Sequence, residues 1–266
     1  MTTLGDTAPQ MFLEERRQRI LEILNEHSAV RISELAPQFN TSTATIRKDL
    51  EQLERDGKLR RTHGGAIKVD PNSTEVMAAS ASIMAHKEKV KIGRAAAAFV
   101  QNNDTFIVQA GTTDLEFIRA LRGKHNLTVI TNDLLIASEC ESISPDSTPI
   151  LVGGSVRVGF HYTEGSETNM LLEQYHASVA YMCTNAFSFE HGFSTHRTEQ
   201  ASWLKTMYRC ADRHIMLIDS SKFGINALAH HNDLPDFDVL VTDSGINEID
   251  RSRLSQLSPN TQIVYA

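Results

Sequence analysis

Hydroxyl and basic side chains gather near the N-terminus in the stretch TSTATIRK (41–48). Serine and threonine hydroxyls bind phosphate oxygens, and an arginine can pair with two acceptors on the edge of a guanine. The stretch RRTH (60–63) adds cations that could hold a flanking phosphate backbone or minor groove. These residue types predict contact with double-stranded DNA, although a solvated amphipathic helix followed by a hairpin is the simpler alternative. The candidate contacts are Ser42, Thr43, Thr45, Arg47, Lys48, Arg60, Arg61 and His63.

A second set of polar residues directly follows hydrophobic runs in the rest of the chain. Glycine lets the backbone approach a ligand closely, and a helix N-terminus favours an anion. A lysine such as Lys222 can pair with a phosphate, and a carboxylate such as Asp219 can accept from sugar hydroxyls. Each group alone is better explained as an ordinary turn, but four together favour one binding site. The four are Gly111-Thr112-Thr113, Thr131-Asn132, Gly153-Gly154 with Arg157, and residues 219–224 with Asp219 and Lys222.

Three helical segments and a basic ribbon are expected to position the first set. Apolar residues recur at helical spacing in 14–27, and Ser33 can cap a second helix over 33–39. A third helix is expected after a cap at Thr41 or Ser42, and it ends at Gly57. KLRRTHGGAI (58–67) then predicts a β-ribbon that turns at Gly64-Gly65. These are the parts of a small α+β winged helix-turn-helix domain, residues 12–68, whose third helix would enter the major groove.

Strands and helices alternate after a small, polar segment at 69–86, which we expect to be a linker. This alternation predicts an α/β domain over 87–266 with a mostly parallel sheet and helices on both faces. Ligands of such sheets bind at the carboxyl ends of the strands, where the second polar set falls. Strands are expected at 105–109, 127–131, 149–152, 179–183, 214–218, 239–242 and 262–265, and helices at 87–100, 114–121, 134–140, 167–174 and 199–211.

The stretch TSTATIRKDLEQLERDGKLRRTHGGA (41–66) resembles the DNA-binding signature of DeoR-type bacterial regulators. The resemblance continues at lower density to about residue 245, where the chain is similar to the family's sugar-phosphate-sensing domain, related in fold to ribose-5-phosphate isomerase. It implies a regulator, usually a repressor, of a sugar-catabolism operon that a phosphorylated sugar releases from its operator. It also matches the four strand-end segments to the family's effector-pocket motifs, and adds Glu199 and Lys205.

The chain departs from the family pattern at several positions. Pro37 is unusual in the second helix, about one turn in, where a lost N–H begins to matter. Ser178 and Cys183 stand where the family commonly has an acidic residue and a glycine, and Asn185-Ala186-Phe187 replaces a glycine-containing stretch. The departures at 178–187 imply either an unusual effector or a pocket that has drifted.

The composition of the chain limits which classes of function are possible. The net charge of −7 argues against coating by nucleic acid, but residues 42–68 hold seven basic and four acidic residues. No apolar run is long enough to span a membrane, no signal peptide is evident, and a cytoplasmic protein is expected. The three separated cysteines fit reduced thiols, with Cys183 and Cys210 in apolar stretches. The adjacent pair His230-His231 would rarely share one metal ion, so no metal or cofactor is expected.

Two other functions remain open. The C-terminal domain could retain isomerase-like catalysis, with Asp219, Lys222 and Glu199 transferring protons on a phosphosugar. It could also serve only to oligomerise a DNA-binding module. We expect no catalytic activity, and a homodimer or homotetramer, because specific affinity for DNA usually needs two half-sites.

Overall fold

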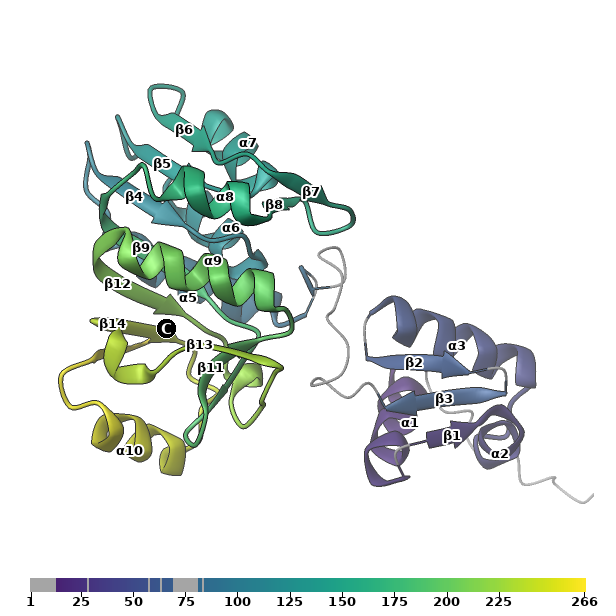
Figure 1. Cartoon of the computed structure of the whole chain (residues 1–266). Coiled ribbons are helices and arrows are strands. Elements are labelled where there is room, and N and C mark those ends of the chain that lie inside the picture. Colours follow the sequence, from purple (N-terminus) through teal and green to yellow (C-terminus); the bar gives the residue numbers. More distant parts are fainter. Residues whose placement is uncertain (1–12, 28, 57, 63, 69–80, 83) are drawn as a thin grey trace, which may run out of the picture. The chain divides into compact units, whose positions relative to one another are not determined.

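The computed structural model describes residues 13–27, 29–56, 58–62, 64–68, 81–82 and 84–266. The chain divides into two compact units, Met1–Val76 and Met77–Ala266 (Figure 1). The division falls within the predicted linker 69–86, most of which lies outside the described residues.

The described part of the first unit holds three helices and a three-stranded antiparallel sheet in the order β1-β3-β2. Isoleucine and leucine side chains from all three helices and from β2 fill its core, among them Ile20, Leu35, Leu50 and Leu59. The predicted winged helix-turn-helix fold is confirmed. Its elements are α1 (Leu13–His27), β1 (Ala29–Arg31), α2 (Ile32–Gln38), α3 (Thr43–Arg55), β2 (Leu59–Thr62) and β3 (Gly65–Lys68).

The start of α2 differs from the prediction. The helix begins at Ile32 directly after β1, so Arg31 occupies the N-cap position, without a side-chain hydrogen bond, and Ser33 lies inside the helix. The short strand β1 pairs with β3 and fixes this entry, a long-range contact that local propensity does not show. Pro37 lies inside α2, one residue before its end, where the interruption affects little of the helix.

The second unit contains a seven-stranded parallel sheet in the order β15-β14-β12-β9-β4-β5-β6. This confirms the predicted α/β fold, and all seven expected strands are present. Their bounds are β4 (Thr105–Val108), β5 (Thr128–Thr131), β6 (Thr148–Leu151), β9 (Ala177–Cys183), β12 (Ala211–Leu217), β14 (Val239–Thr242) and β15 (Gln262–Tyr265).

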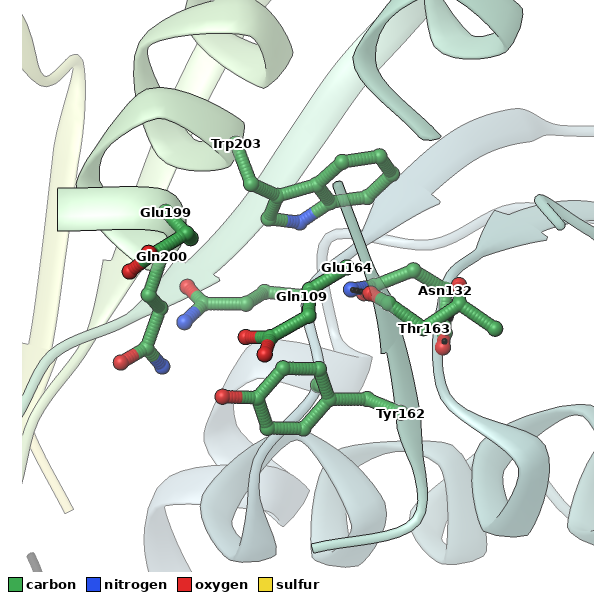
Figure 2. Close-up of a pocket in the computed structure, with 9 residues that line it drawn as sticks. Gln109, Asn132, Tyr162, Thr163, Glu164, Glu199, Gln200 and Trp203 are labelled. Atoms are coloured by element: carbon green, nitrogen blue, oxygen red, sulfur yellow. Dashed lines mark hydrogen bonds between the residues drawn. The ribbon is translucent and has the colours of Figure 1, made fainter. Parts of the chain in front are cut away.

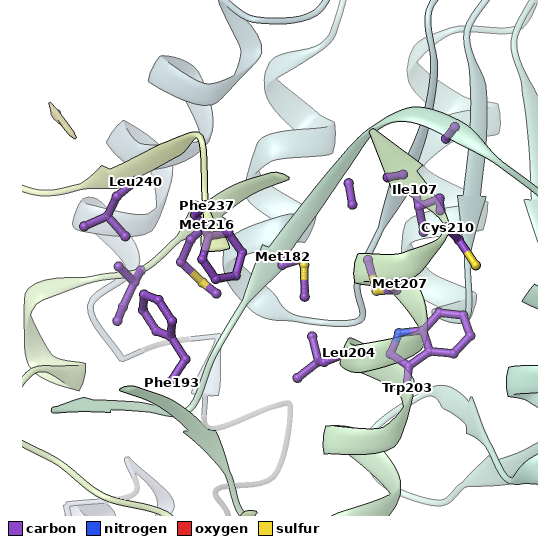
Figure 3. Packing of buried hydrophobic residues seen from close by; sticks show 14 of the residues in the cluster. Ile107, Met182, Phe193, Trp203, Leu204, Met207, Cys210, Met216, Phe237 and Leu240 are labelled. Carbon is purple, nitrogen blue, oxygen red and sulfur yellow. The ribbon is translucent and has the colours of Figure 1, made fainter. Parts of the chain in front are cut away.

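Helices cover both faces of the sheet because successive strand residues point to opposite sides. Phe106 and Val108 pack with α5, α6 and α7, whereas Ile107 packs in the other core with α8, α9 and α10 (Figure 3). Trp203 of α9 lies in this second core. The helices are α5 (His86–Ala97), α6 (Thr112–Ala120), α7 (Leu134–Ile143), α8 (Ser166–Leu172), α9 (Thr198–Arg209) and α10 (Glu248–Leu257).

Several short elements were not predicted. The hairpin β7 (Ser155–Arg157) and β8 (Tyr162–Glu164) follows the edge strand β6. A second small sheet contains β10 (Ala186–Ser188), β11 (Gly192–Thr195) and β13 (Ala229–Asn232), and two 3-10 helices are η1 (Ser220–Lys222) and η2 (Leu234–Asp236). These segments have three or four residues, too few to establish a period. The helix α10 was also missed, because it is mostly polar and buries only Leu254.

Candidate nucleic-acid interface and ligand pocket

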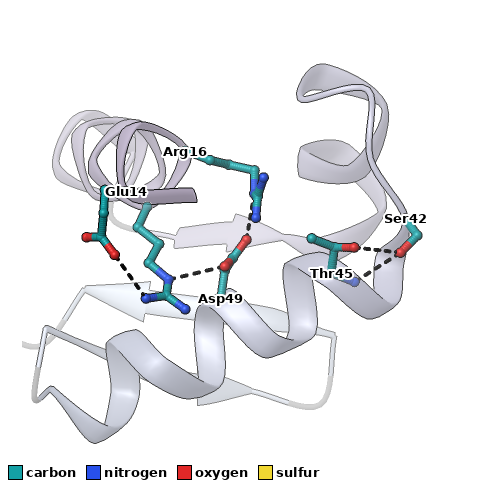
Figure 4. Close-up of polar contacts among 6 residues, drawn as sticks. Glu14, Arg16, Ser42, Thr45 and Asp49 are labelled. Atoms are coloured by element: carbon teal, nitrogen blue, oxygen red, sulfur yellow. Dashed lines mark hydrogen bonds and ion pairs between the residues drawn. The ribbon is translucent and has the colours of Figure 1, made fainter. Parts of the chain in front are cut away.

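The helix α3 starts with a defined cap. Ser42 Oγ accepts a hydrogen bond from the Thr45 amide at 3.1 Å and lies 2.9 Å from Thr45 Oγ1 (Figure 4). The predicted cap at Ser42 is therefore confirmed. The hydroxyls of Ser42 and Thr45 already bond to each other, so neither is wholly available to a base or phosphate.

One face of α3 is open to solvent. Thr43, Ala44, Arg47 and Lys48 are exposed, and their spacing of four residues places Thr43 beside Arg47 and Ala44 beside Lys48. Among the described residues, neither Arg47 nor Lys48 has an ion-pair partner. Two cations without partners next to two small side chains can approach base edges and phosphates. Ala44 was not singled out from the sequence, because an alanine carries no chemistry of its own.

The opposite face of α3 is held by a buried ion-pair cluster. Asp49 is 1% exposed, and its Oδ2 lies 2.6 Å from Arg16 Nε of α1. Asp49 Oδ1 lies 3.2 Å from Arg17 Nε, and Arg17 also reaches Glu14 at 3.5 Å (Figure 4). Removing one partner of such a pair leaves a buried charge uncompensated. Asp49 therefore fixes how α3 sits on α1.

The β2–β3 hairpin forms the wing of the domain, and its two arginines, Arg60 and Arg61, have different surroundings. Arg61 Nη1 lies 3.0 Å from Glu51 Oε1 of α3, and the Arg61 amide donates to Glu54 Oε1 at 2.8 Å. Arg61 must therefore leave Glu51 to reach a phosphate. Arg60 lies in β2 opposite Ile67, but its side chain and the whole of His63 lie outside the described residues.

A pocket opens at the carboxyl ends of β4 and β5 in the second unit. Two of its walls are predicted positions, Asn132 after β5 and Glu199 in the first turn of α9. Trp203 and Tyr162 lie on opposite sides of it, with Gln109 and Glu164 between them (Figure 2). The full lining is Gln109, Ala110, Asn132, Tyr162, Thr163, Glu164, Glu199, Gln200 and Trp203.

Three buried polar atoms of this lining have no hydrogen-bond partner among the described residues. They are Asn132 Oδ1, Glu164 Oε2 and Trp203 Nε1. A buried polar atom without a partner is costly, so such groups normally meet a ligand or water. Two acceptors and one donor facing one pocket are complementary to a molecule that carries several hydroxyl groups.

Cations surround this pocket but are already engaged. Arg197 Nη2 lies 2.9 Å from Glu164 Oε1 and 3.4 Å from Glu199 Oε2. Arg157 donates to the Tyr162 hydroxyl at 2.5 Å and stacks 3.7 Å over the Phe160 ring. The pocket therefore combines carboxylates and aromatic rings. Carboxylates hold Arg197 Nη2, whereas the buried Arg197 Nε has no hydrogen-bond partner among the described residues.

A group of charged and acidic side chains lies next to the pocket, and residues 109–111 connect the two. This cationic cluster consists of Lys89, Asp114, Cys183, Asp219 and Lys222. Gly111 ends this run, and a Cβ there would overlap Cys183 Sγ, so the thiol lies directly on the N-terminus of α6. Burial lowers the pKa of Lys89, while Asp219 raises it and Lys222 and Cys183 also act on it, so these groups lie together.

Burial acts on two acidic side chains of this cluster. Burial raises the pKa of the Asp114 carboxyl and of the Cys183 thiol well above their usual values. Asp114 is completely buried and has no conventional hydrogen-bond partner among the described residues. Asp219 caps η1 and bonds with Ser221. Lys89 and Lys222 therefore bring two ammonium groups together, and the carboxylates of Asp219 and Glu116 also act on Lys89.

Of the remaining predicted residues, the Gly153-Gly154 pair and Lys205 lie apart from these two sites. Gly154 has φ 149°, and a Cβ there would overlap Thr168 Oγ1, so the Gly153-Gly154 pair allows α8 to pack. Lys205 is exposed on α9, outside the pocket lining. Thr112 and Thr113 lie in the first turn of α6, beside Gly111.

The departures from the family pattern have distinct surroundings. Cys183 is half-buried beside Gly111 at the start of α6, whereas Cys140 and Cys210 are buried. The Ser178 hydroxyl donates to the Thr105 carbonyl at 2.9 Å, a strand-pairing contact. Asn185 accepts from Thr195, which also bonds Gln200 of the pocket.

His230 and His231 point apart, as expected for neighbours in a strand. His230 is exposed and lies 3.2 Å from Asp233, whereas His231 is buried and lies 3.1 Å from Thr184 Oγ1. Among the described residues, no helix is both long and apolar enough to cross a membrane.

Comparison with known proteins places both units in one family. Residues 16–72 match the model of the DeoR-like helix-turn-helix domain, and residues 84–244 match that of the DeoR C terminal sensor domain. The chain is 36% identical to the uncharacterized HTH-type transcriptional regulator YulB of Bacillus subtilis (strain 168), over 89% of this chain and 91% of that protein. It is 30% identical to the putative aga operon transcriptional repressor of Escherichia coli O157:H7, over 87% of each chain.

Among solved structures, ribose 5-phosphate isomerase A of Methanocaldococcus jannaschii covers 52% of this chain and 55% of its own, at 14% identity and a TM-score of 0.38. The matched relatives are named as transcriptional regulators rather than as enzymes. With a DNA-binding domain at its N-terminus and a sensor domain matched over most of the remaining chain, the protein belongs to the DeoR family of transcriptional regulators.

Proposed function

We propose that this regulator represses a sugar-catabolism operon and that a phosphorylated sugar releases it from its operator. The observation that carries the proposal is the junction at residues 109–111, where a hydroxyl-binding pocket meets a buried cationic cluster. A sugar phosphate has complementary ends, since its hydroxyls need acceptors and donors and its phosphate needs cations.

The phosphate end is assigned to the cationic cluster. The amides at the start of α6, in Gly111, Thr112 and Thr113, are available to an anion, because Gly111 supplies no side-chain cap. Lys222 and Lys89 supply positive charge to this end of the site. A doubly charged phosphate would offset both the burial of Lys89 and the repulsion between the two ammonium groups.

The sugar end is assigned to the pocket. Asn132 Oδ1 and Glu164 Oε2 would accept from ligand hydroxyls, and Trp203 Nε1 would donate to a ligand oxygen. Glu199 lines the same pocket from α9 and would contact the outer hydroxyls.

Repression is proposed because one matched relative is named as an operon repressor. Release requires that the sugar phosphate bind the operator-free state more tightly than the operator-bound one. We further propose a homodimer or homotetramer, in which two copies of α3 read two half-sites of the operator.

The test begins with a thermal-shift screen of pentose and hexose phosphates, followed by operator binding with any hit. An effector should raise Tm and weaken operator binding by roughly 5–150-fold. Lys222→Ala should bind the operator like the wild type and ignore the effector. If Lys222→Ala responds normally to the effector, or loses DNA binding altogether, the assignment of Lys222 to the phosphate site is wrong.

The same screen separates the alternatives. A protein that only oligomerises would bind DNA and show no shift with any sugar phosphate. A retained isomerase would turn the hit over, which product analysis of the same samples detects.

A further inference from the structure

We propose that Lys89 is the positioning residue that couples the anion site to the chain segment preceding the sensor domain. The inference rests on the proposed function, because it assigns the phosphate to the cationic cluster. Without ligand, Lys89 holds that segment in place. When an anion binds, the Lys89 ammonium turns to the anion and releases the segment.

Lys89 holds the segment at two points. Its Nζ donates to the Ala81 carbonyl at 2.7 Å, and its amide donates to the Ala85 carbonyl at 3.0 Å. Ala85 has φ 49°, in the left-handed region that alanine rarely adopts. A strained residue persists only where its surroundings hold it. The bond to Ala85 is the first backbone bond of α5, so the contact that depends on the lysine side chain is the one to Ala81.

The ammonium is poorly satisfied in this position. Lys89 is 4% exposed, and Ala81 O is the one hydrogen-bond acceptor for Nζ among the described residues. An ammonium has three N–H donors, so two are left for another acceptor. Lys222, nearby, adds a second positive charge that disfavours the cation at Lys89.

An anion changes which partner the ammonium prefers. A hydrogen bond from an ammonium to a phosphate oxygen is charge-assisted and is roughly twice as strong as one to a neutral carbonyl. A phosphate between Lys89 and Lys222 would therefore outcompete the Ala81 carbonyl. Once Nζ leaves, Ala81 loses this bond to α5, and the backbone bond between Lys89 and Ala85 remains.

The released segment is connected along the chain to the DNA-binding domain. Ala81 and Ala85 lie in sequence between the helix-turn-helix domain and the sheet of the sensor domain. A change in how this segment is held alters the tether of each DNA-binding domain, and half-site spacing on an operator is strict. Lys89 thereby links the effector site to operator affinity without itself contacting DNA.

Hydrogen exchange of the intact wild-type protein tests the release step, with inorganic phosphate and then the strongest sugar phosphate of the screen as probes. Exchange in peptides that span Ala81 to Lys89 should become several-fold faster when either probe binds, whereas a merely structural lysine would leave it unchanged or slower. Binding that raises Tm without faster exchange there overturns the inference.

The variant Lys89→Met removes the ammonium and keeps an apolar chain of similar length, and Lys91→Met changes an exposed lysine of the same helix as the matched control. Lys89→Met should bind the operator several-fold more weakly than the wild type and show no further loss at saturating sugar phosphate. Lys91→Met should behave as wild type.

The outcomes distinguish the two proposals. A wild type that no sugar phosphate or phosphate stabilises contradicts the anion site and the proposed effector together. A responsive wild type with an equally responsive Lys89→Met contradicts only the role of Lys89. If Lys89→Met does not fold, the exchange measurement on the wild type decides.

Discussion

The candidate DNA-reading surface and the candidate effector pocket differ in how far apart along the chain their residues lie. Thr43, Ala44, Arg47 and Lys48 belong to two turns of one helix, whereas the pocket joins residues from Gln109 to Trp203. A local surface depends on one helix being held correctly, and a dispersed pocket depends on the whole sheet. The four predictions below test this difference, from the largest expected effect to the smallest.

The largest effect is expected where α3 is attached to α1. Asp49→Ala removes the buried carboxylate that Arg16 and Arg17 share, which should cost about 3–5 kcal/mol of folding free energy. Glu14→Ala is the matched control, because Glu14 is exposed and contacts only the outer side of Arg17 at 3.5 Å. Thermal unfolding with operator binding measures both. Equal effects of the two variants would mean that the buried pair does not hold the helix.

The sensor domain should instead be sensitive to acid. Burial lowers the pKa of His231 to about 4. The buried neutral ring therefore contributes its full stabilisation of the folded domain above pH 6.5, and this contribution is lost as the pH falls toward 4. The loss should reach about 3 kcal/mol. Asp133 opposes this loss of stability. Burial raises the pKa of Asp133 to about 6, so protonation of its carboxyl group stabilises the folded state as the pH falls.

His231→Gln isolates the histidine contribution from that of Asp133. The difference in unfolding free energy between wild type and variant should shrink as the pH falls from 6.5 to 4, while the exposed neighbour variant His230→Gln should show no such trend. A constant difference across this range would contradict a neutral, buried His231.

The sequence predicted the two regions unequally for the same reason. The cap at Ser42 and the apolar face of α3 are local patterns, and they were correct. Asn132 was found because it ends a strand, but Tyr162 and Glu164 lie in a three-residue strand that carries no detectable period. Trp203 was invisible as a site residue, since an apolar helix face does not reveal that Nε1 faces a cavity. Lys205 carries a suitable charge, yet its side chain is exposed to solvent outside the pocket lining.

Within the pocket, Glu164→Gln should weaken binding of the sugar phosphate by about 1–2 kcal/mol, because the amide keeps the shape of the side chain but loses a charged acceptor. The exposed Glu167 gives the control variant Glu167→Gln. Isothermal titration with the effector measures both, and operator binding without effector should not change. Unaltered effector affinity in Glu164→Gln would remove this carboxylate from the site and leave Asn132 and Trp203 as its polar contacts.

The smallest effect is expected at the wing. Arg47 has no ion-pair partner among the described residues, so Arg47→Ala should cost about 1–3 kcal/mol of operator affinity, concentrated at one base position. Arg61 must first leave Glu51, so its net gain on DNA is reduced, and Arg61→Ala should cost less than about 1 kcal/mol, equally for all sequences. Glu51→Ala releases Arg61 and should strengthen DNA binding. Titrations over a range of salt concentrations on an operator found by selection compare the three variants. An Arg61→Ala loss that matches the Arg47→Ala loss would show that the wing reads DNA as strongly as the helix, and the local surface would then extend to β2.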